Sequence, residues 1–356
     1  MPRVVIAAGG TAGHVVPALA VADALRASGA EVDFVGGERA EAQLVPAAGY
    51  PFHAIQVRGI DRRNPLKAAR AILLAVIALP RALALLRRLK PGVVIGGGGY
   101  VAGPVGLAAL LLRIPLILTE ADSHLGMANR LLAPAAKRVF LSFPLAGRDG
   151  KKYVVSGRPI PPGTGKADRS EARARFGIDA NEQCLLVFGG SLGARTLNEA
   201  AIEAFGAAAP CAILHASGHR DYDGLRAKLD ELGSPPHYHL HPYIEPFADA
   251  LAAADLATAR AGGSVLELAA AGLPSVLVPY PHATADHQTS NARWMEQEGA
   301  AVVVPDAQLS GPRLAREVGG LLGAPGRLQA MATAAERVAK PEAASTIARA
   351  ALELAA

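Results

Sequence analysis

Three short glycine-rich segments of this sequence have the composition of phosphate-binding loops. They are Gly9 to His14, Gly96 to Gly103 and Gly189 to Gly193, and each lies between an apolar run and a helix-forming run. A glycine loop in that position lets backbone N–H groups and the positive end of a helix approach a phosphate closely. One such loop could serve a tight turn alone, but three together indicate a phosphate-containing ligand. Neither Gly-Lys-Ser/Thr nor the full dinucleotide-binding spacing occurs, which argues against a nucleoside triphosphatase and a dehydrogenase.

His14 ends the first loop, where a helix is expected to begin. The N-terminus of a helix disfavours the protonated imidazole, so the ring stays available as a base or a hydrogen-bond partner. A side chain that can take a proton beside a phosphate loop is well placed for catalysis. The alternative is a histidine that only caps or packs the helix, and its position alone leaves both interpretations open.

Two segments in the second half of the chain carry further polar groups after apolar runs. In the segment Arg260 to Glu267, the N–H groups of Gly262 to Ser264 could meet a diphosphate, and Glu267 could accept two hydrogen bonds from a ribose diol. The segment Pro281 to Asn291 is dense in neutral donors and acceptors, which suits sugar hydroxyls. A solvated glutamate in a first helical turn and an ordinary polar surface loop are the alternatives.

A metal site has little support in the sequence. Asp221-Tyr222-Asp223 has the Asp-x-Asp spacing with which some sugar transferases hold a divalent ion. The same residues are more easily interpreted as the cap of the following helix. The zinc-protease motif His-Glu-x-x-His does not occur, and His237, His239 and His241 alternate along an expected strand without cysteine partners. We therefore expect no metal and no cofactor.

The elements that must position these residues alternate along the whole chain. Short β-branched runs alternate with alanine- and leucine-rich runs, which is typical of βαβ units around parallel sheets. The expected fold class is α/β, with two Rossmann-like, doubly wound parallel-sheet domains that face a cleft. The expected strands are Arg3 to Ala8, Glu31 to Val35, Phe52 to Val57, Val93 to Ile95, Leu116 to Leu118, Arg138 to Leu141, Tyr153 to Val155, Cys184 to Phe188, Ala212 to His215, His237 to His241, Leu256 to Thr258, Ser275 to Val278 and Ala301 to Val303.

The two halves of the chain open alike, each with a strand, a glycine turn, a hydroxyl residue, a glycine and a helix, and residues 157–166 between them have a linker composition. We expect an N-terminal domain over residues 1–160 that binds the acceptor and the membrane. A C-terminal domain over residues 161–340 would bind the nucleotide sugar. Residues 341–356 would form a helix that packs back on the N-terminal domain.

Length and composition exclude several classes of protein. The 356 residues are 51% hydrophobic and only 19% charged, which excludes a disordered chain. The longest apolar stretches are too short to span a bilayer, and the first residues lack the features of a secretory signal, so we expect a cytosolic protein. The net charge of +5 permits an anionic partner. Nucleic acid is not expected as a partner, because aromatic residues make up 4% of the chain and no basic-aromatic stretch occurs.

The segment Lys67 to Lys90 combines many apolar residues with a basic rim. Pro80 is expected to kink or divide its helix. A buried core helix would explain part of the apolar surface. Apolar residues around most of the circumference with a basic rim also describe a surface that rests on anionic lipid, and the residues alone do not decide between the two.

Four segments lie in order along nearly the whole chain, at residues Gly9 to Ala20, Gly98 to Pro104, Gly189 to Ala194 and Glu267 to Pro274. Together they resemble the MurG family, the peptidoglycan transferases that add N-acetylglucosamine from UDP-N-acetylglucosamine to lipid I. The resemblance implies a GT-B fold, inversion at the anomeric carbon, no required metal, and a peripheral protein on the cytoplasmic face of the cell membrane. Lipid I, the undecaprenyl-diphosphate-linked muramoyl peptide, would be the acceptor, and Lys67 to Lys90 would face an anionic membrane.

The resemblance also implies roles for individual residues. His14 would be the catalytic base or an organiser of the acceptor hydroxyl. The acceptor diphosphate would be held by Gly10, Thr11, Ala12, Gly13, Gly97, Gly98, Gly99 and Tyr100. The donor would be bound by Thr11, Gly13, Asp122, Arg158, Ser191, Ile244, Gly263, Ser264, Glu267, His287, Gln288 and Asn291. Among these, Ser191 and the Gly263-Ser264 helix start would meet the diphosphate, Ile244 the uracil and Glu267 the ribose, while the last three would address the sugar.

Three features depart from the family pattern. Thr119-Glu120-Ala121-Asp122 stands where the family commonly has His-Glu-Gln-Asn, so Asp122 takes the place of an amide. A basic residue usual near Pro161 is missing, and Arg158 could compensate for it. The loop Arg260 to Glu267 is one residue shorter than usual. The alternatives are a GT-B transferase for another lipid, a UDP-N-acetylglucosamine epimerase, or a non-catalytic partner that binds a UDP-sugar.

Overall fold

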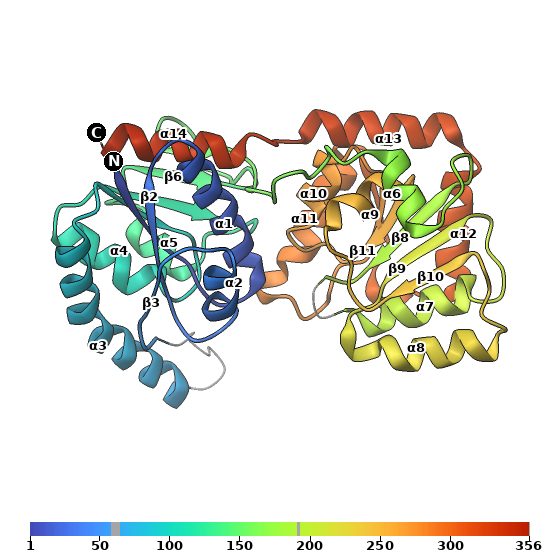
Figure 1. Ribbon diagram of the computed structural model, residues 1–356, viewed down its shortest axis with the longest axis horizontal. Helices are drawn as coiled ribbons and strands as arrows, with labels where there is room; N and C mark the ends of the chain where they lie inside the picture. The colour runs from blue at the N-terminus through green and yellow to red at the C-terminus, as the bar shows by residue number, and fades with distance from the viewer. Residues whose placement is uncertain (58–64, 191–192, 356) are drawn as a thin grey trace. The chain divides into compact units, whose positions relative to one another are not determined.

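The computed structural model describes residues 1–57, 65–190 and 193–355 (Figure 1). It divides into two compact units, each with its own parallel sheet. Unit 1 comprises Met1–Pro162 and Lys340–Ala356, and unit 2 comprises Gly163–Ala339.

Unit 1 is built on a seven-stranded sheet with the order β3-β2-β1-β4-β5-β6-β7, in which all neighbouring strands are parallel. Its strands are β1 (Arg3–Ala7), β2 (Glu31–Gly36), β3 (Phe52–Ala54), β4 (Val93–Gly96), β5 (Leu116–Glu120), β6 (Arg138–Leu141) and β7 (Tyr153–Val155). Its helices are α1 (Ala12–Ala27), α2 (Glu41–Ala47), α3 (Pro65–Leu89), α4 (Ala102–Leu111), α5 (Met127–Leu132) and α14 (Ala343–Ala355).

Alternate residues of the central strand face opposite layers of helices in unit 1, as the two-residue period of a strand requires. Val4 and Ile6 belong to the core formed with α1, α2 and the C-terminal helix α14. Val5 and Ala7 belong to the core formed with α3, α4 and α5. The sheet is therefore covered on both faces, which is typical of parallel sheets.

Unit 2 repeats this plan with a six-stranded parallel sheet in the order β10-β9-β8-β11-β12-β13. Its strands are β8 (Cys184–Phe188), β9 (Ala212–Ala216), β10 (Tyr238–His241), β11 (Leu256–Ala259), β12 (Ser275–Leu277) and β13 (Ala301–Val303). Its helices are α6 (Arg169–Phe176), α7 (Arg195–Phe205), α8 (His219–Glu231), α9 (Phe247–Ala253), α10 (Val265–Ala270), α11 (His287–Gln297), α12 (Gly311–Leu322) and α13 (Pro325–Val338), with 3₁₀ turns η1 (Thr284–Asp286) and η2 (Asp306–Gln308).

The strand order reverses once in each sheet, between β1 and β4 in unit 1 and between β8 and β11 in unit 2. Ligands of open parallel sheets bind outside the carboxyl ends of the strands at such a switch point. All three predicted glycine loops follow strands that flank a switch point, namely β1, β4 and β8.

The α/β fold class and the alternation of elements are confirmed, with local corrections. β3 ends at Ala54 rather than Val57 because its partner β2 ends at Gly36, whose carbonyl accepts the N–H of Ile55 at 2.8 Å. The helix α3 continues through Pro80 and is not divided there. A stripe of buried residues at Ala78, Ala82 and Leu86 anchors this part of α3 against the sheet.

Candidate active site

The two glycine loops of unit 1 touch each other, and His14 lies against both. A Cβ atom on Gly99 would fall 2.0 Å from the carbonyl oxygen of Gly9, so only glycine permits this approach. A Cβ atom on Gly98 would lie 3.5 Å from Nδ1 of His14, and one on Gly10 would lie 3.8 Å from Cδ2 of the same ring. The structure therefore brings together the predicted base and the predicted acceptor loops.

Arg158 braces the first loop from inside unit 1. Its buried guanidinium donates from Nη2 to the carbonyl oxygen of Gly13 at 2.6 Å and from Nη1 to that of Ala121 at 3.5 Å. These bonds join the start of α1 to the segment after β5. Arg158 thus positions the backbone around two predicted site residues, Gly13 and Asp122.

Glu120 organises the segment after β5 that contains Asp122. Its Oε1 accepts the N–H of Asp122 at 3.2 Å, and its Oε2 accepts the N–H of Gly126 at 2.8 Å and Nδ2 of Asn129 at 2.9 Å. Burial raises the pKa of Glu120 to about 7, against the lowering effect of the bonds from Gly126 and Asn129. The side chain of Asp122 itself is half-buried.

A chain of neutral polar groups lies behind the glycine loop of unit 2. Asn198 on α7 donates from Nδ2 to the carbonyl oxygen of Ser217 at 2.9 Å and to Asp221 Oδ2 at 3.1 Å, so its Oδ1 is left as an acceptor. Nε2–H of His215 therefore donates to that oxygen across 3.1 Å, and Nδ1 accepts the hydroxyl of Tyr238 across 2.8 Å. Complete burial lowers the pKa of His215 to about 3, which fixes the neutral imidazole.

Asp221 and Asp223, which have the Asp-x-Asp spacing, lie inside the helix α8 and not at its cap. The helix α8 begins at His219 after Gly218, so Asp221 lies inside the first turn and the predicted cap is wrong. The carboxylate of Asp221 accepts from Asn198 and from Arg220 Nε at 2.9 Å. In the part of the chain that the structure describes, no three His, Cys, Asp or Glu side chains gather as a metal site would need.

The turn after β11 carries the predicted diphosphate and ribose contacts. Arg260 fixes its base: the buried guanidinium contacts Asp306 Oδ1 at 2.6 Å and donates to Thr196 Oγ1 at 2.6 Å. Gly263 and Ser264 follow and lead into α10, and the hydroxyl of Ser264 makes no capping hydrogen bond to the helix. Glu267 lies half-buried in the first turn of α10.

The predicted sugar-binding residues on α11 also hold loops together. Oε1 of Gln288 accepts the N–H of Tyr280 at 2.9 Å, and the buried Asn291 donates from Nδ2 to the carbonyl oxygen of Ala261 at 3.0 Å. These bonds tie α11 to the segment after β12 and to the turn after β11. His287 begins α11 in a half-buried position.

Two predicted donor contacts of unit 2 lie in the segments after β8 and β10. Ile244 follows β10 and is buried. Ser191 lies outside the described residues.

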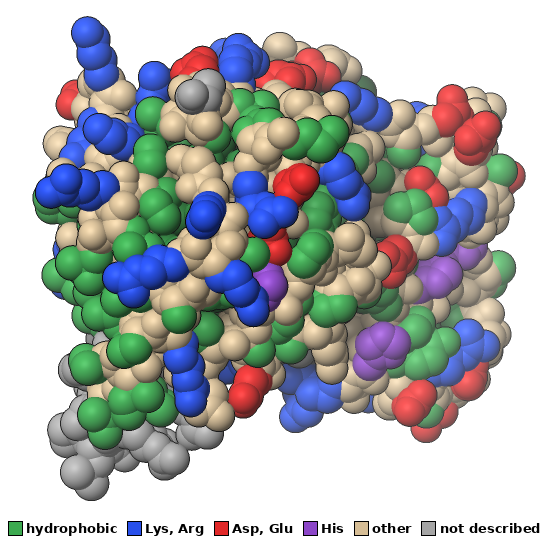
Figure 2. All heavy atoms as spheres, turned by 60° about the vertical axis from the view of Figure 1, so that its left-hand side comes forward, with side chains coloured by type: hydrophobic (Ala, Val, Ile, Leu, Met, Phe, Trp, Pro, Cys, Tyr) green, Lys and Arg blue, Asp and Glu red, His purple; other side chains and the backbone are tan. Residues whose placement is uncertain are grey.

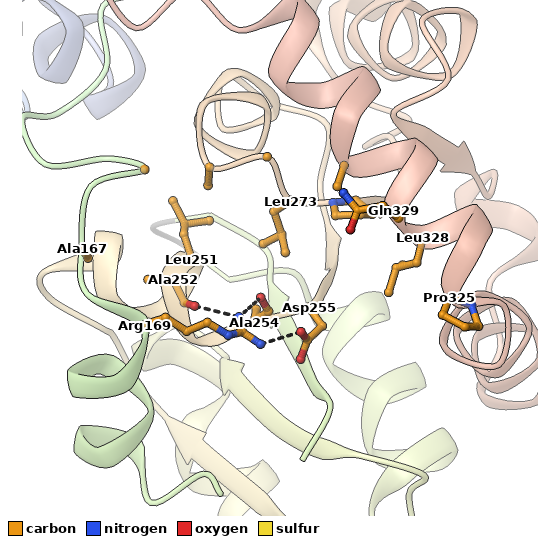
Figure 3. Close-up of a pocket in the computed structure, with 15 residues that line it drawn as sticks. Ala167, Arg169, Leu251, Ala252, Ala254, Asp255, Leu273, Pro325, Leu328 and Gln329 are labelled. Carbon is orange, nitrogen blue, oxygen red and sulfur yellow. Dashed lines mark hydrogen bonds and ion pairs between the residues drawn. The ribbon is translucent and has the colours of Figure 1, made fainter. Parts of the chain in front are cut away.

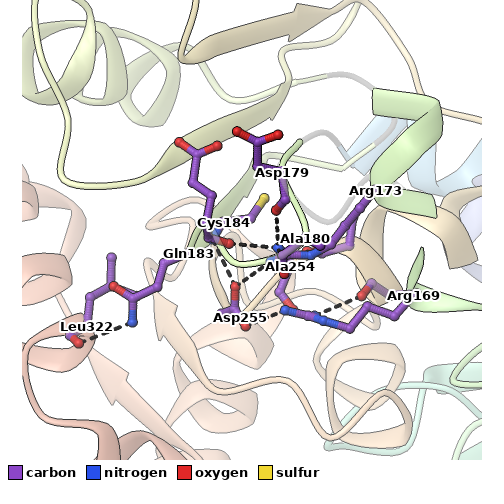
Figure 4. A network of polar contacts seen from close by, with 12 residues as sticks. Arg169, Arg173, Asp179, Ala180, Gln183, Cys184, Ala254, Asp255 and Leu322 are labelled. Carbon is purple, nitrogen blue, oxygen red and sulfur yellow. Dashed lines mark hydrogen bonds and ion pairs between the residues drawn. The ribbon is translucent and has the colours of Figure 1, made fainter. Parts of the chain in front are cut away.

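A cavity within unit 2 lies at the other end of its sheet, away from the predicted site. A cavity of about 450 Å³ opens beside Asp255 and Pro274, which immediately precede β11 and β12 (Figure 3). The buried Arg173 stabilises this end by donating to Asp255 at 2.8 Å and to the carbonyl oxygens of Asp179, Ala180 and Glu182 (Figure 4). The cavity is thus separated from the loops at the carboxyl ends of the strands.

Several residues that shape the site were not predicted from the sequence. Glu41, His215 and Asn198 are buried polar groups whose partners come from distant positions in the chain. A glutamate four residues after Gly36-Gly37 was the available signal for Glu41, but the sequence does not show what it contacts. Arg260 and Glu120 belong to segments that the sequence singles out, Arg260 to Glu267 and Thr119 to Asp122, but the sequence predicted no role for either residue.

Comparison with known proteins places the chain in a family. The family models for the N-terminal and C-terminal domains of glycosyltransferase family 28 match residues 4–141 and 184–347. A relative from Moorella thermoacetica, named UDP-N-acetylglucosamine--N-acetylmuramyl-(pentapeptide) pyrophosphoryl-undecaprenol N-acetylglucosamine transferase, is 43% identical over 97% of each chain. A relative of the same name from Methylococcus capsulatus is 42% identical over 99% of this chain and 98% of its own. The chain belongs to the MurG family of glycosyltransferases.

Solved structures agree with this assignment to the MurG family. The crystal structure of Acinetobacter baumannii MurG is 31% identical and superposes with a TM-score of 0.81 over 99% of this chain and 100% of its own. The UDP-GlcNAc 2-epimerase from Neisseria meningitidis superposes with a TM-score of 0.68 over 99% of this chain and 100% of its own, but at 14% identity, so that likeness shows the fold alone. The GT-B fold expected from the resemblance is confirmed.

Proposed function

We propose that this protein transfers N-acetylglucosamine from UDP-N-acetylglucosamine to the C4 hydroxyl of lipid I, which gives lipid II for peptidoglycan synthesis. The observation that carries the proposal is the pair of switch points with phosphate-type glycine loops, in a chain that matches transferases of that name over nearly its whole length. The enzyme is a hexosyltransferase of the inverting type.

The reaction is a direct displacement. His14 takes the proton of the C4 hydroxyl, the oxygen forms a bond with the anomeric carbon, and the bond from that carbon to the diphosphate oxygen breaks. Negative charge grows on the leaving UDP. Preorganised N–H groups that face this charge supply the stabilisation that the reaction needs.

The UDP part of the donor would be bound by unit 2, and its sugar would also meet Thr11, Gly13, Asp122 and Arg158 of unit 1. N–H groups at Gly263 and Ser264, together with Ser191, meet the UDP diphosphate, and the backbone of Ile244 meets the uracil. The half-buried carboxylate of Glu267 accepts the two ribose hydroxyls. His287 addresses the sugar directly, whereas Gln288 and Asn291 also keep the surrounding loops in register.

Unit 1 would bind the acceptor diphosphate. The first N–H groups of α1, at Ala12 and Gly13, have no partner inside the helix and can donate to an anion together with that of Thr11. Gly10 and the segment Gly97 to Tyr100 form the walls of this site. Asp122 and Arg158 lie next to the same loops and complete the contacts to the sugars.

Unit 1 would also bind an anionic membrane surface, where the lipid-linked acceptor is located. Exposed apolar side chains gather on neighbouring helices of unit 1, at Leu73, Val76 and Ile77 of α3, Leu107 and Leu111 of α4, and Leu131 of α5. Exposed basic residues accompany them, at Arg81, Arg87, Arg88, Arg113, Arg130 and Lys137. Figure 2 shows hydrophobic side chains interspersed with Lys and Arg on this unit. Such a surface suits the interface of an anionic bilayer.

This arrangement supports peripheral binding on the cytoplasmic face of the cell membrane. Among the residues that the structure describes, none of the helices has the length and apolar character needed to cross a bilayer. The test is sedimentation with phosphatidylglycerol vesicles, with phosphatidylcholine vesicles as the comparison. Val76→Glu should reduce binding to the anionic vesicles, and Leu232→Glu, a matched change of an exposed apolar residue in unit 2, should not. Equal binding of both variants and the unaltered protein would contradict the membrane assignment.

The proposed reaction is tested by UDP release from UDP-N-acetylglucosamine in the presence of EDTA, with and without a lipid I analogue. We expect release only when the analogue is present, and a disaccharide product of inverted configuration. Consumption of the donor without the analogue would indicate an epimerase. Donor binding without release would indicate a non-catalytic protein or another acceptor.

A further inference from the structure

The carboxylate of Glu41 lies at the centre of three loops in unit 1. The side chain is fully buried at the start of α2. Its Oε2 accepts the N–H of Gly10 at 2.9 Å, while its Oε1 accepts the N–H of Gly37 at 2.9 Å and the hydroxyl of Tyr100 at 3.1 Å. One side chain thus joins the loops that follow β1, β2 and β4.

Glycines surround this carboxylate because larger residues would collide with it. A Cβ atom on Gly9 would lie 2.7 Å from Oε1 of Glu41, and one on Gly37 would lie 3.0 Å from the same oxygen. A side chain at either glycine would therefore collide with Oε1, which also accepts the hydroxyl of Tyr100 from the third loop. Gly9 and Gly37 are therefore needed to make room for Glu41, and not only to make room for a phosphate.

Three donors converge on Glu41, and a carboxylate meets them all because it is an acceptor only. Tyr100 donates its single O–H hydrogen bond to Glu41, so toward a ligand the hydroxyl oxygen can act only as an acceptor. Burial and the neighbouring Glu41 charge raise the pKa of Tyr100 to about 12, so the hydroxyl keeps that proton. Gly10 likewise donates its N–H to Glu41. The N–H groups of Thr11 to Gly13 are then the donors that this loop can offer to an anion.

The groups that Glu41 holds lie beside His14. A Cβ atom on Gly10 would lie 3.7 Å from Cε1 of Tyr100 and 3.8 Å from Cδ2 of His14, so both rings pack against this glycine. Rotation of the Gly10 peptide would therefore disturb both rings and the N–H groups that follow.

We propose that Glu41 is the positioning residue of the acceptor site: its carboxylate fixes Gly10 and Tyr100 so that the start of α1 and His14 meet the lipid-linked diphosphate and sugar. The inference rests on the proposed function and adds to it a residue that does not itself touch the substrate. It predicts that Glu41 governs the acceptor and leaves the donor, whose UDP part binds unit 2, unaffected.

The test compares full-length Glu41→Gln with the unaltered enzyme in the UDP-release assay. The amide keeps the size of the side chain but directs donor hydrogens at groups that are themselves donors. We expect the KM for a lipid I analogue to rise at least about tenfold or kcat to fall by a similar factor, with the donor KM within about twofold. Glu31→Gln, an exposed carboxylate of the same unit, is the matched control and should change neither constant.

A second variant separates positioning from folding. Tyr100→Phe removes one of the three donors and should raise the acceptor KM by a smaller factor. Combined with Glu41→Gln it should add little, because both changes break the same contact. A merely structural role would lower the fraction of folded enzyme, measured by the amplitude of the thermal unfolding transition, without changing either KM.

The outcomes distinguish this inference from the proposed function. An unaltered enzyme that releases no UDP with the lipid I analogue would overturn both. An active enzyme whose Glu41→Gln and Tyr100→Phe variants keep the acceptor KM and kcat, or raise both KM values equally, would overturn the role of Glu41 alone.

Discussion

Units 1 and 2 share a sheet topology but differ in the charged groups that they bury. Among the described residues, the buried carboxylates are all in unit 1, at Asp33, Glu41 and Glu120. The buried charged residues of unit 2 are Arg173 and Arg260, accompanied by neutral groups. Unit 1 also buries Arg158, so the difference lies in its carboxylates.

The two kinds of charge use different backbone groups. Glu41 and Glu120 consume N–H groups, such as those of Gly10 and Gly126, which are then lost as donors to a ligand. Arg260 instead donates to the carbonyl oxygens of Val278 and Pro279, and Asn198 donates to the carbonyl oxygen of Ser217. Arg260 and Asn198 thus occupy no backbone N–H groups through these bonds, whereas Glu41 and Glu120 do, and backbone N–H groups are the donors that a diphosphate needs. The buried carboxylates therefore reduce the number of N–H donors that these loops of unit 1 can offer to a ligand.

The sharpest test of this division is His14→Ala in unit 1. Loss of a general base lowers turnover by roughly 10²- to 10⁴-fold. Because the UDP part of the donor belongs to unit 2, UDP binding should stay unchanged. Steady-state kinetics and calorimetric titration with UDP measure the two effects. Unchanged turnover would remove His14 from the chemistry, and a parallel loss of UDP binding would break the division between the units.

The buried histidine of unit 2 should make that unit less stable in acid. Burial lowers the pKa of His215 to about 3, so the unfolded chain binds a proton that the folded chain refuses between about pH 6.5 and pH 3. The free energy of unfolding should therefore fall with decreasing pH by an amount on the order of 5 kcal/mol over that window. Thermal unfolding of the full chain and of His215→Gln at several pH values measures the difference. An equal pH dependence for the two proteins would contradict this assignment.

The buried carboxyl of unit 1 should act with the opposite sign in an overlapping window. Burial raises the pKa of Glu120 to about 7, so the folded chain holds a proton that the unfolded chain has released between about pH 4.5 and pH 7. The contribution of Glu120 to stability is present below that window and is lost as the pH rises, by roughly 3 kcal/mol. Relative to the full chain, Glu120→Gln should gain stability as the pH rises from 5 to 7.5. A constant difference between their unfolding midpoints would show that Glu120 does not titrate in this range.

The sequence was sufficient for the sheets and for where their loops lie, because both depend on local patterns. Alternating β-branched and helical runs predicted every strand to within a few residues, and glycine after β1, β4 and β8 marked the switch points. The supports behind those loops were not predictable in the same way. Glu41 reaches Tyr100 across 59 positions, and His215 reaches Asn198 across 17, so these contacts exist only once the sheet is assembled.

Glu267→Ala gives the smallest effect and tests the donor side of the comparison. Loss of a carboxylate that accepts hydrogen bonds from the ribose diol removes about 1.5 to 3 kcal/mol of binding, so the donor KM should rise roughly 10- to 150-fold. The acceptor KM should not change, in contrast to Glu41→Gln. Glu171→Ala, an exposed glutamate in the first turn of α6 in the same unit, is the control for loss of a first-turn charge. If both variants keep the donor KM of the unaltered enzyme, Glu267 is a solvated first-turn residue, and the ribose contact must come from elsewhere in unit 2.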